Sequence, residues 1–151
     1  MPELKNLMIS VSGVRGIIGD GLTPEVALHF AQAYGSRFGP GRIVVGRDSR
    51  VTGELIKYAV WAGLLSSGCD VVDIGMTTTP TTAMITEKAE NAGGIIITAS
   101  HNPREWNALK LLAHDGLFLS PEAGGDILDR VRQQEFRFAA WDQVGRVIPY
   151  P

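Results

Sequence analysis

A reactive hydroxyl stands in a short polar segment of this chain. Ser100 belongs to the run Thr98-Ala99-Ser100-His101-Asn102-Pro103, which directly follows the apolar run Ile95-Ile96-Ile97. The β-branched run predicts a buried strand, and ligands of α/β sheets bind just past the carboxyl ends of strands. Pro103 fixes its own φ and restricts Asn102, so the loop should be stiff. Such a loop could present Ser100 for reaction; the alternative from these residues alone is a capped turn with a chemically idle serine.

The three histidines favour neither a serine hydrolase nor a zinc site. The sequence has no Gly-x-Ser-x-Gly elbow, and sequence neighbours such as Ser100 and His101 seldom point at one another as nucleophile and base must. His29 falls in a helical pattern and is expected to be structural, whereas His114 lies beside a turn and is expected to be solvated. Their spacing does not match a metal-ligand motif.

Helix and strand patterns alternate along the chain and must position this loop. Three helices are expected to begin at Thr23-Pro24, Thr79-Pro80 and Ser120-Pro121, where a capping hydroxyl precedes a proline suited to the first turn. A further helix is expected from Thr52 to Gly68, and the helix from Thr79 should extend to about Glu90. The expected strands are 43–45, 70–74 and 95–98, and a Gly-rich stretch at 12–21 follows an apolar run at 7–10.

A turn signal lies near the end of this pattern. Asp115-Gly116 is flanked by Leu109 and Leu111 on one side and by Leu117 and Leu119 on the other, which predicts a hairpin. The alternation as a whole predicts an α/β fold, a three-layer α/β/α sandwich with a mixed, mostly parallel sheet and an antiparallel edge hairpin.

Composition describes an ordinary single domain. The 151 residues are 44% hydrophobic and 20% charged, with a formal net charge of −2, and scattered cations give no nucleic-acid surface. No apolar run is long enough to span a membrane, and the N-terminus does not resemble a secretory signal. The lone Cys69, expected as a small buried residue at the start of a strand, favours a reducing compartment. We therefore expect a cytoplasmic protein.

The C-terminal segment is less periodic than the rest. It carries the aromatic residues Phe136, Phe138 and Trp141 and stops at Pro-Tyr-Pro. We expect one domain over residues 1–134 and, over 135–151, a tail or linker toward downstream domains that this sequence does not include.

Four stretches in order along the chain resemble one enzyme superfamily, the α-D-phosphohexomutases, which include phosphoglucomutase, phosphomannomutase and phosphoglucosamine mutase. The segment around Ser100 is similar to their phosphoserine signature. The matching residues are Thr98–Pro103 with Asn107 and Lys110, Ser12–Gly16, Val45–Arg50, and Asp73–Gly75 with Thr79-Pro80. The resemblance extends from about Ile9 to Val131. One departure is Ala108, which follows Asn107 where the family usually has glycine; because alanine disfavours positive φ, the bend before Lys110 is expected to differ.

The resemblance implies an isomerase that transfers a phosphoryl group within a hexose phosphate. The serine aligned with Ser100 carries a phosphate, donates it to the free hydroxyl of the sugar, and recovers the other phosphate from a bisphosphate intermediate. It also implies Mg²⁺, bound by the phosphoserine and by an aspartate-rich loop of the next domain. This sequence contains no Asp-x-Asp-x-Asp pattern, so we expect the chain alone to be inactive and its longer parent to be a mutase.

The resemblance also assigns roles to individual side chains. Ser100 would be the phosphoryl carrier and one metal ligand, and Lys110 a cation beside the transferring group. Arg15, in a Gly-flanked loop, would bind phosphate oxygens, unless it pairs with Asp20 or solvent. His101 would transfer a proton or hydrogen-bond near the substrate.

Another group of residues is expected to brace the serine loop rather than react. Arg47, Asp48 and Arg50 follow a predicted strand on the same side of the sheet, where an ion pair could hold the loop.

The residues also allow three different readings of the function. The parent could be a phosphoglucosamine mutase, the chain could be a non-catalytic phosphate-binding relative of the fold, or it could be an interaction module that docks a partner through the tail aromatics. An intact motif around Ser100 favours the enzyme, because a domain that only binds phosphate needs no nucleophile there. The sequence does not distinguish glucose, mannose and glucosamine phosphates as substrates.

Overall fold

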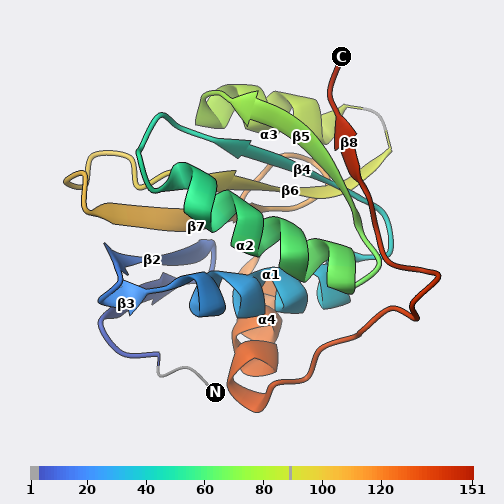
Figure 1. Ribbon diagram of the computed structural model, residues 1–151, viewed down its shortest axis with the longest axis horizontal. Helices are drawn as coiled ribbons and strands as arrows, with labels where there is room; N and C mark the ends of the chain where they lie inside the picture. Colours follow the sequence, from blue (N-terminus) through green and yellow to red (C-terminus); the bar gives the residue numbers. More distant parts are fainter. Residues whose placement is uncertain (1–3, 89) are drawn as a thin grey trace.

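The protein forms one mixed β-sheet with helices on both faces (Figure 1). The computed structural model describes residues 4–88 and 90–151. The strands lie in the order β1-β2-β7-β6-β4-β5-β8, and β3 pairs with β2. The strands are β1 (Leu7–Ser10), β2 (Gly13–Ile18), β3 (Gly21–Leu22), β4 (Arg42–Arg47), β5 (Asp70–Met76), β6 (Asn91–Ile97), β7 (Trp106–Leu112) and β8 (Val147–Pro149). The helices are α1 (Pro24–Phe38), α2 (Gly53–Ser66), α3 (Thr79–Glu87) and α4 (Pro121–Gln133).

The sheet has a parallel part and an antiparallel part. Strands β4, β5, β6 and β8 run parallel to one another. Strand β7 is antiparallel to both β6 and β2, and the β1–β2 pair forms an antiparallel hairpin at the sheet edge. The expected mixed α/β fold is therefore confirmed.

Two adjacent glycines of β6 show how closely the helices approach both faces of the sheet. A Cβ atom on Gly93 would lie 2.0 Å from the Tyr34 hydroxyl of α1, and one on Gly94 would lie 2.3 Å from the Thr86 hydroxyl of α3. Because successive strand residues face opposite sides, α1 and α3 cover opposite faces. In Figure 1, α2 crosses in front of the sheet and α3 lies behind it. This is the expected three-layer arrangement.

Hydroxyl caps start three of the helices, as the sequence predicts. The side chains of Thr23, Thr78 and Ser120 each accept a hydrogen bond from the backbone N–H three residues later, and each helix has a proline in its first two positions. In α3 the cap is Thr78, one residue before the predicted Thr79, and the helix ends at Glu87 rather than near residue 90.

The core lies between the sheet and the helices α1, α2 and α4. The largest fully buried side chains of the molecule are Tyr34, Leu22, Ile43, Ile56, Leu64, Ile95, Ile96, Ile97, Leu109, Leu111, Leu112 and Ile127. Of these, Ile96 and Leu112 lie outside this core, on the opposite face of their strands. Burial of such side chains provides the main favourable free energy of folding. No helix within residues 4–88 and 90–151 is long and apolar enough to cross a membrane.

Two local expectations were wrong. The Gly-rich stretch from residue 12 to 21 is not a loop but contains β2 and β3. Glycine is required in β2 because a Cβ on Gly13 would lie 1.9 Å from the carbonyl oxygen of Leu109. The turn at Asp115-Gly116 closes no regular hairpin, since only an isolated bridge joins Leu112 to Phe118. The antiparallel hairpin lies instead at β1–β2.

The C-terminal segment lies against the domain along much of its length. Strand β8 extends the sheet by pairing with β5. The ring of Phe136 lies 5.4 Å from that of His29 on α1, while Phe138 and Trp141 are exposed. Arg137 donates hydrogen bonds to backbone carbonyls at the ends of α1 and α2.

The expectations for Cys69 and for His29 and His114 agree with the structure. Cys69 is fully buried immediately before β5, and burial raises the pKa of its thiol to about 11. His29 is half-buried on α1 and burial lowers its pKa, whereas His114 is exposed.

Candidate active site

Ser100 lies in the loop that connects β6 to β7, at the carboxyl edge of the parallel strands. Its side chain is exposed, whereas Ala99, the residue before it, is buried. The backbone of Ser100 has φ of 54°, in the left-handed region that residues other than glycine rarely adopt. A strained residue persists only where its surroundings hold it, so the contacts of this loop decide how Ser100 is presented.

The guanidinium of Arg50 holds the serine loop through four backbone carbonyls. One of its terminal nitrogens donates to the oxygens of Ser100 at 3.0 Å and Asn102 at 2.7 Å. The other donates to the oxygens of Pro103 at 2.6 Å and Trp106 at 3.0 Å. Because the guanidinium is planar and rigid, these bonds fix the orientation of the peptide groups as well as their distance.

Asp48 links this arginine to the end of β6. Its carboxylate lies 3.3 Å from Nε of Arg50 and accepts a hydrogen bond of 2.6 Å from the Thr98 hydroxyl. The Thr98 hydroxyl in turn accepts a bond from the backbone N–H of Ser100 at 3.3 Å. Arg47 donates to the carbonyl of Asp48 at 3.1 Å. The loop is braced as predicted, and the bracing reaches the backbone of Ser100 from both sides.

Lys110 approaches the serine hydroxyl directly. It lies on β7 between the buried residues Leu109 and Leu111, so its side chain emerges from the opposite face of the sheet, as predicted. Its Nζ donates to Oγ of Ser100 at 2.5 Å. An ammonium in this position can stabilise negative charge on Oγ or on a phosphoryl group attached to it.

Arg15 reaches the same loop from β2. Its guanidinium donates to the side-chain oxygen of Asn102 at 3.3 Å. The alternative pairing with Asp20 does not form; the carboxylate of Asp20 accepts from Asn6 instead. Arg15 belongs to a strand rather than to the expected loop, and its register partner across the sheet is Ala108, two residues before Lys110.

His101 follows Ser100 and is exposed. Among residues 4–88 and 90–151, its imidazole has no hydrogen-bond or ion-pair partner. His101 is therefore the sequence neighbour of Ser100, but its ring makes no hydrogen bond with Lys110 or Arg15.

The departure at Ala108 does not bend the chain. Ala108 is buried within β7, and positive φ values among the non-glycine residues described occur only at Asn6, Ser100 and Gln134. Asn107, also buried, donates to the Thr52 hydroxyl at 3.0 Å. Alanine is therefore accommodated here without strain, because this position has an ordinary strand backbone.

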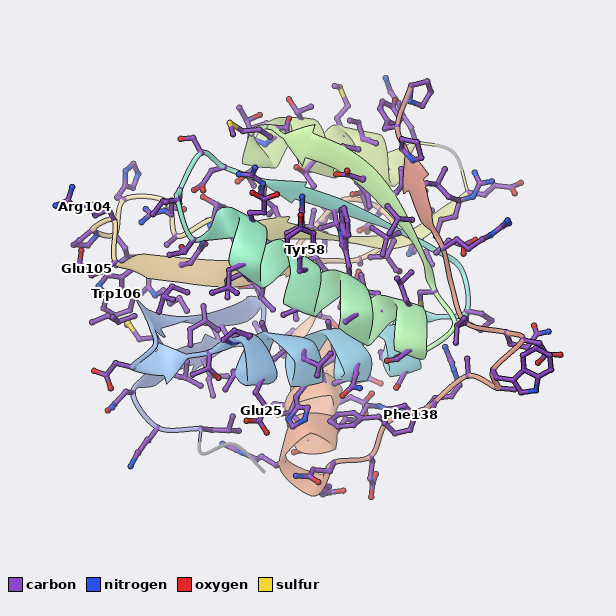
Figure 2. All side chains as sticks on the ribbon, in the orientation of Figure 1. Glu25, Tyr58, Arg104, Glu105, Trp106 and Phe138 are labelled. Atoms are coloured by element: carbon purple, nitrogen blue, oxygen red, sulfur yellow. The ribbon has the colours of Figure 1, made fainter. Side chains whose placement is uncertain are left out.

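A pocket of about 360 Å³ opens beside these cations over β1, β2 and β7. Arg15 and Lys110 contribute its charged groups, and Met8, Val14 and Phe118 contribute apolar surface. Figure 2 shows Arg104, Glu105 and Trp106 together at the end of the molecule where the loop enters β7. An anionic ligand in the pocket would meet both cations, of which Lys110 also contacts the Ser100 hydroxyl.

The described residues do not complete a magnesium site. Mg²⁺ requires about six oxygen ligands in octahedral geometry. No group of three or more His, Cys, Asp or Glu side chains that could hold a metal occurs in residues 4–88 and 90–151. Ser100, the expected metal ligand, would supply one oxygen, and Asp48 is already engaged by Thr98 and Arg50.

Sequence reasoning did not anticipate the parts played by Thr98 and Asn102. The Thr98 hydroxyl connects Asp48 to the backbone of Ser100, and the Asn102 side chain receives Arg15. The available signal was the placement of two polar side chains two residues on either side of Ser100. Their partners are distant in sequence, and so the bonds themselves depend on the fold.

Comparisons with known proteins agree on one family. The family model described as "Phosphoglucomutase/phosphomannomutase, alpha/beta/alpha domain I" matches residues 7–138. A protein of Thermococcus kodakarensis named "Phosphoglucomutase/phosphomannomutase" is 43% identical over 140 residues, which cover 89% of this chain and 31% of that protein. One of Methanopyrus kandleri named "Probable phosphoglucosamine mutase" is 42% identical over 137 residues, covering 91% and 30%.

A solved structure shows the same fold. The crystal structure of a phosphoglucomutase/phosphomannomutase family protein from Burkholderia thailandensis superposes with a TM-score of 0.80 at 27% identity, covering 95% of this chain and 34% of that one. The α/β/α sandwich of this chain thus occurs in a phosphoglucomutase/phosphomannomutase family protein. This chain belongs to the phosphoglucomutase/phosphomannomutase family and corresponds to its domain I. It spans about a third of the length of the relatives it matches.

Proposed function

We propose that this chain is the phosphoserine domain of a phosphohexomutase, an isomerase that moves a phosphoryl group between the 1- and 6-positions of a hexose phosphate. The observation that carries the proposal is the contact of the Lys110 ammonium with Oγ of Ser100, in a loop held by Arg50. Family membership supports the same assignment.

The proposed chemistry is a pair of opposite phosphoryl transfers at Ser100. In the first, the bond between Oγ and phosphorus breaks as a sugar hydroxyl oxygen bonds to phosphorus, and the hydroxyl proton ends on Oγ. In the second, Oγ bonds to the phosphorus of the other phosphate as the bond between that phosphorus and its own sugar oxygen breaks, and the Oγ proton passes to the sugar oxygen so released. Phosphoryl transfer depends chiefly on positioning and charge stabilisation, and the strained, clamped Ser100 loop is suited to positioning.

The cations around the loop would stabilise the charge. A phosphoserine carries a charge of about −1.5 to −2 near neutral pH. Lys110 is placed to neutralise charge on Oγ and the transferring group, and Arg15 to bind the phosphate oxygens of the substrate. His101 could donate a hydrogen bond or a proton from the solvent side of the loop. We infer these roles from the contacts of Lys110 and Arg15 and from the exposure of His101.

The remaining parts of the reaction would come from outside these 151 residues. We infer that the parent continues beyond a domain formed by residues 1–134, with 135–151 leading toward domains that complete the sugar and magnesium sites. Mg²⁺, when bound, would neutralise charge on the phosphoserine oxygens. The chain alone should be inactive. A parent acting on hexose phosphates fits a cytoplasmic enzyme without membrane or nucleic-acid partners, and the single, buried cysteine of this chain is consistent with that location.

The sugar specificity has two candidates. One relative is named for glucose and mannose phosphates and another of nearly equal identity for glucosamine phosphate. Both candidates require the same Ser100 chemistry. The domain responsible for the choice lies outside this chain.

The test is the substitution Ser100→Ala in the full-length parent. Turnover of glucose, mannose and glucosamine phosphates should be abolished while the protein remains folded, because the phosphoryl carrier is lost. Arg104→Ala, an exposed position in the same loop, provides the matched control and should remain active. Retained turnover on any of these sugar phosphates by the Ser100→Ala enzyme would overturn the proposal.

A further inference from the structure

The main-chain N–H of His101 lies next to the proposed phosphoryl carrier and has no assigned role. Among residues 4–88 and 90–151 this N–H has no hydrogen-bond acceptor. Neighbouring amides of the loop do have one: the N–H of Ser100 donates to the Thr98 hydroxyl, and that of Asn102 donates to the carbonyl of Ala99. The site therefore leaves one backbone donor open directly after Ser100.

The Arg50 clamp determines where this donor points. The carbonyl oxygen of Ser100 faces the guanidinium of Arg50 at 3.0 Å. The carbonyl of Ser100 and the N–H of His101 belong to one peptide group, and in a planar trans peptide these two bonds point in opposite directions. Holding the carbonyl against Arg50 therefore turns the N–H away from Arg50.

Two cations expected to bind phosphate contact the same loop. Ser100 Oγ is contacted by Lys110, and Arg15 reaches the loop at Asn102. A backbone N–H beside a residue in the left-handed conformation can contribute to an anion site. Ser100 has that conformation, with φ of 54°, and the N–H of His101 is the donor next to it that has no acceptor within the loop.

We propose that the main-chain N–H of His101 is a phosphoryl-binding donor of this site and that Arg50 is the positioning residue that aims it. The proposal rests on the proposed function of Ser100 as phosphoryl carrier. A donor fixed before reaction costs no reorganisation when charge develops. It would bind an oxygen of the phosphoryl group on Ser100 independently of the imidazole of His101.

The proposal can be tested by NMR on the 151-residue chain with phosphoserine installed at position 100 by genetic encoding. The amide proton of His101 should move downfield relative to the unmodified chain, further than that of Asn102, whose N–H already has an acceptor. The His101→Gln variant keeps the main-chain donor and should show the same shift. In Arg50→Lys, which retains the charge but loses the rigid fork, the shift should diminish provided the core resonances show a folded domain.

The outcomes separate this inference from the proposed function. If the His101 amide does not move on phosphorylation, or moves no further than that of Asn102, the proposed donor is wrong even if Ser100 carries phosphate in the parent. If the shift survives Arg50→Lys in full, the positioning by Arg50 is wrong. If the shift occurs but Ser100 is not phosphorylated in the active parent, the function fails while the local geometry stands.

Discussion

Two arginines in this domain make the same kind of contact, hydrogen bonds to several backbone carbonyls, but in regions with different roles. Arg50 donates to four carbonyls of a single loop, the one that carries Ser100. Arg137 donates to carbonyls at the carboxyl ends of two helices, including Gly35 and Gly39 of α1 and Ser67 after α2. Both guanidinium groups donate hydrogen bonds to several backbone oxygens that lie far from them in sequence.

The difference lies in what each clamp restrains. The ends of α1 and α2 are regular structure, and a cation there complements the helix dipoles, so Arg137 should contribute to stability alone. The loop held by Arg50 contains a residue in a strained left-handed conformation. Arg50 should therefore contribute to the geometry of the reacting group, and the two arginines can be distinguished by experiment.

The largest difference between the two arginines is expected in the turnover of the full-length parent that carries Arg50→Lys. Lysine keeps the charge but cannot hold four carbonyls in one plane, so Ser100 should be misplaced. A displacement of about 1 Å typically costs on the order of 10²-fold in rate, and we expect a loss of that size in kcat with little change in KM. Steady-state kinetics measure this loss. Arg132→Lys, at an exposed arginine on α4, is the control. An unchanged kcat would show that Arg50 does not position the reacting group.

The next effect concerns Arg137→Lys. Losing hydrogen bonds between a charged donor and backbone carbonyls should lower the free energy of unfolding by about 2 kcal/mol. Turnover per folded molecule should not change, because the affected carbonyls lie at the helix ends. Urea denaturation measures the stability, and the parent enzyme assay measures the turnover.

Cys69 offers a local readout of the same substitution. Its buried thiol has a pKa raised to about 11 by desolvation, and the nearby Arg137 opposes this shift. Labelling by a thiol reagent should be slow in the native chain, because little thiolate forms and the site is closed. Arg137→Lys keeps the positive charge but loses the bonds that hold the ends of α1 and α2 over Cys69, so labelling should become faster because the site opens more often. Arg50→Lys should leave the rate unchanged. Equal acceleration in both variants would show that the two clamps are not independent.

Part of this comparison could be foreseen from the sequence, and part could not. Capping hydroxyls and prolines predicted the starts of α1, α3 and α4 to within a residue, because those signals are local. The alternation of Leu109, Lys110 and Leu111 likewise placed the lysine on the face that reaches Ser100. The four carbonyl contacts of Arg50 could not be predicted, since they depend on the path of a loop about fifty residues away.

The strands at the sheet edges were also beyond local reasoning. Strand β2 is rich in glycine because β7 approaches its backbone closely at Gly13, and in sequence this resembles a loop. Strand β8 has three residues and forms only by pairing with β5. Both depend on tertiary contacts that override local propensity.

A smaller effect, on the free energy of unfolding, tests the strain at Ser100 itself. Glycine adopts the left-handed region without a Cβ penalty, so Ser100→Gly should stabilise the domain by about 0.5 to 1 kcal/mol while abolishing turnover in the parent. Gln134, with φ of 55° at the end of α4, is the matched position in the region of Arg137. Gln134→Gly should stabilise by a similar amount and leave turnover intact. Thermal denaturation compares the two; destabilisation by Ser100→Gly would contradict the account of strain.

The smallest effect is a pH dependence of stability at His29, where α1 meets the C-terminal segment. Burial lowers the pKa of His29, whose ring packs against Phe136 beside Arg137. A base with a depressed pKa in the folded state binds a proton more readily when unfolded, so stability should fall as the pH drops below the ordinary histidine value of about 6.5. His29→Gln should reduce that loss, as measured by denaturation at a series of pH values. An identical pH profile in the variant would show that His29 does not cause the loss of stability.

The central claim is that Ser100 carries the phosphoryl group. It is tested most directly by incubating the full-length parent with a hexose 1,6-bisphosphate and mapping the modified peptide by mass spectrometry. We predict one phosphoryl group on Ser100, lost again when a hexose monophosphate is added and transferred to that sugar. A parent that interconverts hexose phosphates with Ser100 unmodified throughout, or with the phosphate on another residue, would contradict the account.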